Sequence, residues 1–124
     1  MKKISYSELL KKLYEVKGTR GEGFKKTLSY FGNPHEALQT IHIAGTNGKG
    51  SVSWKIAEAL MIGGKRVGLY TSPHIKTFRE RIQINGEKIK REEVEEWLPV
   101  VFKAAGDACT FFELTTLLAF LHFS

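Results

Sequence analysis

The sequence predicts an α/β protein with a doubly wound, mainly parallel sheet and flanking helices. Three consecutive segments predict this class: a short β-type run at 40–44 (TIHIA), apolar residues at helical spacing across 52–60, and a second β-type run at 66–70 (RVGLY). Strand, helix and strand in this order form a βαβ unit with a right-handed crossover. Two parallel strands are few for a free-standing sheet, so we expect the 124 residues to be a piece of a larger protein.

The N-terminal part is predicted to be helical. Residues 5–8 (SYSE) have the spacing of a capping box, and apolar residues then recur at i, i+3, i+4, i+7 and i+8 from Tyr6 to Tyr14. The three glycines of 17–23 (KGTRGEG) predict a loop. A short helix is expected over 24–31, ending at the Gly-Asn-Pro sequence of 32–34.

The C-terminal part is predicted to hold a hairpin and two helices. Asn85 and Gly86 separate two β-type runs and are typical of a type I′ turn. A helix is expected over 92–105, with a kink or a break at Pro99. The last helix, 111–123, is apolar on most sides and should be buried. Two strands cannot cover both helices, so we expect exposed apolar surface, marginal stability and association.

The composition is that of a soluble globular chain. Hydrophobic residues make up 42% and charged residues 26%. No apolar run approaches the ~20 residues of a membrane-spanning helix, and the N-terminus lacks the apolar stretch of a signal peptide. Cys109 is the only cysteine, which excludes an intrachain disulfide and fits a reducing cytoplasm. We interpret it as a small buried residue and not as a nucleophile.

The net charge of +6 bears on the kind of ligand. A basic balance suits nucleic acid, a membrane surface or a small anion. A nucleic-acid-binding module would cluster Lys and Arg with interleaved aromatic residues, and the basic residues here are spread through the chain. Phosphate and carboxylate ligands fit this distribution at least as well.

A glycine loop, residues 45–51 (GTNGKGS), joins the first predicted strand to the helix that follows. Its backbone amides can converge on phosphate oxygens, the helix N-terminus adds its positive dipole end, and Lys49 supplies a point charge. The loop departs from the pattern G-x-x-x-x-G-K-[ST], with Ile43 at the first glycine and Gly50 at the Ser/Thr position. A glycine-rich turn with a chance lysine is the alternative. The flanking strand and helix favour a P-loop-type phosphate site.

The longer string 41–51 (IHIAGTNGKGS) resembles the phosphate loop of the folylpolyglutamate and dihydrofolate synthases, a branch of the Mur ligase family. Three further stretches are similar to that branch in the same order: 67–75 (VGLYTSPHI), 78–86 (FRERIQING) and 110–115 (TFFELT). At 23–27 (GFKKT) the chain departs from the family's usual Gly-Leu-x-Arg-Ile. This departure weakens a pterin-site assignment for residues 18–26.

The resemblance implies that residues 1–124 are the N-terminal part of an ATP-binding domain, with the remainder of that domain and a C-terminal domain outside the chain. It implies Mg²⁺ ligation by Ser72 and Glu113, and a folate-side position for His74. A turn former before Pro73 is the alternative for Ser72, and a helix-end acid is the alternative for Glu113. The residues that the resemblance assigns to the triphosphate are Thr46, Asn47, Gly48, Lys49, Gly50 and Ser51.

The implied activity is that of an ATP-dependent carboxylate–amine ligase in folate biosynthesis and one-carbon metabolism. L-Glutamate would be added to dihydropteroate or to a folate through an acyl phosphate, with Lys49 as the catalytic cation and ATP and Mg²⁺ as cofactors. The resemblance further implies a cytoplasmic protein, monomeric at full length, without nucleic-acid or membrane partners. The 124 residues alone are expected to be inactive. A peptidoglycan-precursor Mur ligase and a P-loop nucleotide-binding fragment without ligase activity are the alternatives.

Overall fold

A computed structural model describes residues 4–18, 22–44, 49–72 and 76–124, apart from the side chain of Lys49. The chain divides into two compact units. One comprises residues 1–38 and 90–124, and the other comprises residues 39–89. We call them the helical unit and the sheet unit and describe each by itself.

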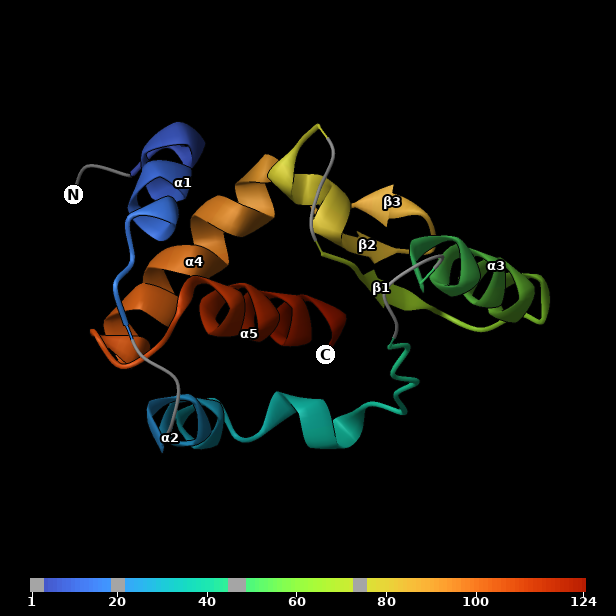
Figure 1. Ribbon diagram of the computed structural model, residues 1–124, viewed down its shortest axis with the longest axis horizontal. Coiled ribbons are helices and arrows are strands. Elements are labelled where there is room, and N and C mark those ends of the chain that lie inside the picture. The colour runs from blue at the N-terminus through green and yellow to red at the C-terminus, as the bar shows by residue number, and fades with distance from the viewer. Residues whose placement is uncertain (1–3, 19–21, 45–48, 73–75) are drawn as a thin grey trace. The chain divides into compact units, whose positions relative to one another are not determined.

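The helical unit is composed of the N-terminal and C-terminal parts of the chain. Its elements are helices and one short 3-10 turn (Figure 1). Helix α4 packs against α5, α1 and α2, and α1 also contacts α5. The bounds of these elements are α1 (Tyr6–Tyr14), α2 (Glu22–Tyr30), η1 (Pro34–Ala37), α4 (Arg91–Ala105) and α5 (Phe111–Phe123).

Apolar side chains of three helices form the core of this unit. The fully buried ones are Leu9, Leu13, Val94, Leu98, Val101, Leu114, Leu117 and Leu118. The expectation that the last two helices would be left uncovered is therefore wrong. Helices α4 and α5 cover each other, and the apolar stripe of α1 covers both, so neighbouring helices bury the surface that was assigned to missing strands.

Local sequence signals account for most boundaries in the helical unit. The Ser5 hydroxyl accepts a hydrogen bond from the amide of Glu8 at 3.3 Å and caps α1, as predicted. Gly32 and Asn33 end α2 with positive φ angles of 77° and 53°. Of the expected kink or break at Pro99, the break is wrong, because α4 is continuous from Arg91 to Ala105, and the kink stays a prediction. The buried residues Leu98 and Val101 lie on either side of the proline, and their packing offsets the lost backbone hydrogen bond.

The sheet unit contains α3 (Lys49–Ile62), β1 (Gly68–Tyr70), η2 (Phe78–Arg81), β2 (Ile82–Ile84) and β3 (Glu87–Lys88). The three strands form an antiparallel sheet in the order β1-β2-β3 (Figure 1). Asn85 and Gly86 connect β2 to β3 with φ angles of 50° and 81°, the positive values that a type I′ turn requires. The predicted hairpin is confirmed.

The predicted parallel pair of strands is not formed among the described residues. Residues 39–44 belong to no strand, and Ile41 is 63% exposed. A strand is held by hydrogen bonds to a neighbouring strand. The strand with which β1 pairs is β2. The segment 40–44 has strand-forming residues but no pairing partner in the part of the chain that the structure describes.

Among the described residues, no helix is both long enough and apolar enough to cross a membrane.

Candidate nucleotide and metal site

The first turn of α3 carries three of the predicted phosphate-binding residues. Lys49, Gly50 and Ser51 begin this 14-residue helix, whose first turn contains no acidic residue. The free amides and the dipole of a helix start attract anions, and an acid there would weaken that attraction. A Cβ at Gly50 would meet no atom within 4 Å, so the glycine leaves open space at the helix start. Thr46, Asn47 and Gly48 lie outside the described residues.

Ser72 lies two residues beyond β1 and is half-buried. Its Oγ accepts a hydrogen bond from Nη1 of Arg81 at 3.3 Å. The amide of Thr71 donates to the carbonyl of Arg81 at 3.0 Å, so the end of β1 is tied to the start of β2 by backbone and side chain together. This arrangement fixes the hydroxyl and leaves it a second lone pair for a cation. His74, the predicted folate-side residue, lies outside the described residues.

Arg81 is a site neighbour that reasoning from the sequence missed. Its side chain is only 7% exposed, which is unusual for an arginine. The signal that could have identified it is the Arg-Glu-Arg of 79–81. The carboxylate of Glu80 accepts from the amides of Lys76 and Thr77, at 3.1 and 3.0 Å, and closes a capping box on η2. The short turn therefore delivers Arg81 in a defined orientation.

Glu113 stands in the first turn of α5, in the helical unit. Its Oε1 accepts from the amide of Thr110 at 2.9 Å, and its own amide donates to the Thr110 hydroxyl at 3.2 Å. This reciprocal capping box is the helix-end role that was the alternative interpretation. It uses one carboxylate oxygen and leaves the other to serve a cation. Ser72 and Glu113, the two predicted metal ligands, belong to different units.

Comparison with known proteins finds relatives in the family that the sequence motifs resemble. The Haloferax volcanii protein named "Probable bifunctional folylpolyglutamate synthase/dihydropteroate synthase" is 36% identical over 132 residues, which cover 97% of this chain and 16% of that protein. The dihydrofolate synthase/folylpolyglutamate synthase of Bacillus subtilis is 39% identical over 110 residues, which cover 81% of this chain and 25% of that protein. The crystal structure of folylpolyglutamate synthase from Thermotoga maritima matches 95% of this chain and 30% of its own, with 43% identity and a TM-score of 0.83.

Over almost its whole length the chain is similar to one part of folylpolyglutamate synthases and dihydrofolate synthases, a family of longer proteins. A bifunctional synthase of this family, crystallised with Mn, AMPPNP and L-glutamate bound, matches 97% of the chain with 27% identity and a TM-score of 0.78. No protein-family model matches the chain. The chain spans 16% to 30% of the length of these relatives.

The match to folylpolyglutamate synthase structures confirms the predicted fold class, although the described residues contain only an antiparallel sheet. Lys49, Gly50, Ser51 and Ser72 belong to the sheet unit, and Glu113 belongs to the helical unit. No cluster of three or more His, Cys, Asp or Glu side chains suited to a metal occurs among the residues that the structure describes.

Cys109 has the structural role that was predicted for it. The side chain is buried, and its Sγ lies 3.7 Å from Oγ1 of Thr27. Burial away from water raises the pKa of the Cys109 thiol, against the lowering effect of the Thr27 contact. A thiol with a raised pKa carries little thiolate at neutral pH, so it is a poor nucleophile.

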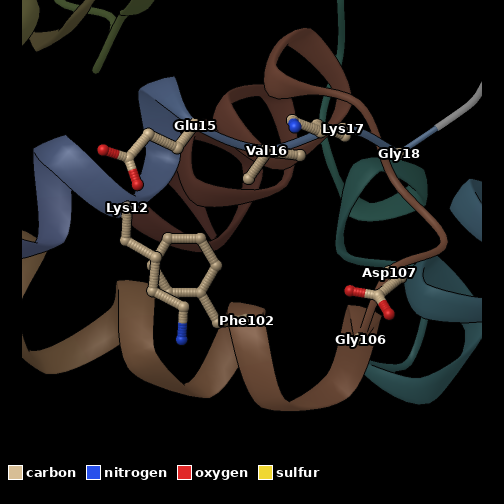
Figure 2. A pocket seen from close by; sticks show the side chains of 8 residues that line it. All are labelled: Lys12, Glu15, Val16, Lys17, Gly18, Phe102, Gly106 and Asp107. Carbon is tan, nitrogen blue, oxygen red and sulfur yellow. The ribbon is translucent and has the colours of Figure 1, made fainter.

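A hollow of about 630 Å³ lies in the helical unit between the ends of α1 and α4 (Figure 2). Lys12 lines this hollow, and its Nζ lies over the Phe102 ring, 4.6 Å from the ring centre. Its lining mixes cations, anions and apolar groups, and none of the predicted site residues takes part. The lining residues are Lys12, Glu15, Val16, Lys17, Gly18, Phe102, Gly106 and Asp107.

Proposed function

We propose that this chain forms the nucleotide-binding part of an ATP-dependent ligase that adds L-glutamate to dihydropteroate or to a folate. The observation that carries the proposal is the match of 97% of the chain to a synthase with Mn, AMPPNP and L-glutamate bound. A helix that begins at Lys49, directly after the glycine loop, supports it independently. ATP and a divalent cation are the cofactors of this proposal, with Mg²⁺ as the cation.

The reaction needs activation because a carboxylate is a poor electrophile. In the proposed mechanism an oxygen of the substrate carboxylate attacks the γ-phosphorus of ATP in line, ADP leaves, and an acyl phosphate forms. The amine of L-glutamate then attacks the acyl carbon, loses a proton, and displaces inorganic phosphate. The first step brings two anions together, so the site must supply positive charge.

The residues of this chain divide that task between them. We assign the triphosphate to residues 46–51, where the loop amides, the α3 dipole and Lys49 supply positive charge. Ser72 and the second oxygen of Glu113 offer the hard oxygen ligands that Mg²⁺ prefers. When bound, Mg²⁺ would neutralise phosphate charge. His74 is assigned to the folate side.

The length of the relatives extends the proposal to the whole protein. We propose that glutamate binding and the remaining metal ligands lie outside these 124 residues, which alone would have no ligase activity. We further propose a cytoplasmic monomer, supported by the single cysteine and by the biosynthetic relatives.

Trapping the intermediate tests the mechanism. A full-length protein that contains this chain is incubated with ATP, Mg²⁺, the pteroate or folate acceptor and hydroxylamine in place of glutamate. An acyl phosphate gives the acceptor hydroxamate, because hydroxylamine attacks the activated carbonyl. Hydroxamate that forms only with ATP supports the proposal. Binding of ATP without any hydroxamate would favour a nucleotide-binding protein that lacks ligase activity.

A further inference from the structure

Two segments of the helical unit meet backbone to backbone. One contains Gly18 and the start of α2 with Gly23, and the other is the connection between α4 and α5. A Cβ on Gly18 would overlap the carbonyl group of Cys109 and lie 2.9 Å from its amide nitrogen. A Cβ on Gly23 would overlap the carbonyl oxygen and the Cβ of Ala108 and lie 3.0 Å from its carbonyl carbon. Backbone atoms cannot rotate away as a side chain can, so only glycine permits this contact.

The requirement for glycine here is one of space. Gly32, Gly64, Gly86 and Gly106 have positive φ angles, and Gly18 and Gly23 are not among these residues. A positive φ is therefore not what requires glycine at these two positions, and the neighbouring backbone excludes a side chain. Replacing either one should push the two segments apart without straining a turn.

Helix α2, which contains Gly23, makes a further contact with the residues before α5. The hydroxyl of Thr27 donates to the carbonyl of Gly23 at 2.7 Å and lies 3.7 Å from the sulfur of Cys109. Thr27 is 3% exposed and Cys109 is 1% exposed, so water is excluded from the contact. We call this closely packed contact the joint: Gly18, Gly23 and Thr27 lie on one side of it, and Ala108 and Cys109 lie on the other.

The joint ends at the start of α5. Cys109 directly precedes Thr110, the N-cap residue whose capping box holds the carboxylate of Glu113. On the other side of Thr110, the ring of Phe111 stacks on Tyr14 of α1 with centroids 5.2 Å apart. The start of α5 is therefore held on both sides of Thr110. Gly18 and Thr27 contact Cys109, and Tyr14 contacts Phe111.

We propose that Gly18 and Gly23 are positioning residues that set the place of the α5 first turn and, through it, of the Glu113 carboxylate. This inference rests on the proposed function, in which Glu113 binds the metal.

Cys109 is the only cysteine of the chain and reports directly on the joint. The reaction of its thiol with an aromatic disulfide reagent is followed in the 124-residue protein. An inserted methyl group against backbone should favour local opening and speed labelling about tenfold or more in Gly18→Ala and Gly23→Ala. The matched control is Gly63→Ala, whose Cβ would lie at an ordinary 3.4 Å from the nearest atom, and which should label at the parental rate.

A second control separates a loosened joint from a generally weakened fold. Leu13→Ala removes a fully buried side chain of α1 outside the joint and lowers stability. In a full-length protein with ligase activity, Gly18→Ala should raise the Mg²⁺ concentration for half-maximal rate, as Glu113→Gln should. Leu13→Ala should leave it unchanged.

The outcomes separate the joint, its link to Glu113 and the metal assignment. Parental labelling rates in both glycine variants would overturn the joint itself. Faster labelling with an unchanged Mg²⁺ requirement would overturn the positioning of Glu113. If Glu113→Gln also kept the parental Mg²⁺ requirement, the metal assignment of the proposed function would fall, while the labelling result would still establish the joint.

Discussion

Lys49 begins α3, where a lysine can supply the point charge that the β- and γ-phosphates of ATP require. We predict that ATP with Mg²⁺ stabilises the full-length protein by about 2.7 kcal/mol when the nucleotide is present at 100 times its Kd. Lys49→Ala should lose most of this stabilisation, measured as a thermal shift. Lys55→Ala changes an exposed lysine on the same helix and should keep it. Equal shifts for Lys49→Ala and the parent would remove Lys49 from the phosphate site.

Glu113 holds two roles in this account, and one substitution separates them. Glutamine can also occupy the third position of a capping box, so Glu113→Gln keeps the helix start and removes the charge. We predict that turnover falls more than ATP affinity does, because a metal ligand stabilises charge that develops in the transition state. Steady-state kinetics at saturating Mg²⁺ measure both. Near-parental turnover would leave Glu113 with its capping role alone.

Single residues were predictable where their role is local. The Ser5 cap and the burial of Cys109 follow from residue type and spacing. Burial of Arg81 and the need for glycine at 18 do not, because each depends on a segment distant in the sequence: the end of β1 for Arg81, and the residues before α5 for Gly18.

At the scale of elements, the same distinction separates success from failure. The hairpin was predicted because Asn85–Gly86 specifies it locally. The segment 40–44 was predicted as a strand from composition, but a strand also requires a pairing partner, and its composition cannot supply one. The covering of α4 and α5 by α1 is likewise a tertiary fact.

The hairpin turn offers a test at this scale. Gly86 has a φ of 81°, a conformation that costs an L-residue about 1 kcal/mol or more. Gly86→Ala should lower the free energy of unfolding by about that amount in urea titrations. Gly63→Ala, at the end of α3 and without a positive φ, should change it by less. Equal effects of the two substitutions would contradict the type I′ assignment.

At the scale of the whole molecule, helices of the two units differ in how well they bury their apolar residues. Helices α4 and α5 of the helical unit bury most of their apolar residues, whereas α3 of the sheet unit buries Ala57 and exposes Val52, Trp54 and Ile62, the last at 88%. Outside these helix contacts the helical unit also exposes large apolar side chains: Ile4, Tyr14, Tyr30, Val100 and Phe112. Exposed apolar groups of this size favour association, and they occur in both units, so association of the 124-residue protein stays a prediction.

Hydrogen exchange should show this difference. We predict that amides of α3 exchange faster than those of the buried turns of α4 and α5, because local opening is easiest where few apolar contacts are lost. Mass spectrometry of peptides from the 124-residue protein measures both in one sample. Uniform protection across the chain would show instead that the two units unfold as one.

The central claim is that this chain supplies the nucleotide site of a glutamate ligase. The most direct test is the release of inorganic phosphate by a full-length protein that contains this chain, given ATP, Mg²⁺ and either dihydropteroate or a folate, with and without L-glutamate. The account predicts phosphate release that requires both the acceptor and L-glutamate, and that is abolished in Lys49→Ala. Phosphate release that is indifferent to glutamate, or none with either acceptor, would contradict it.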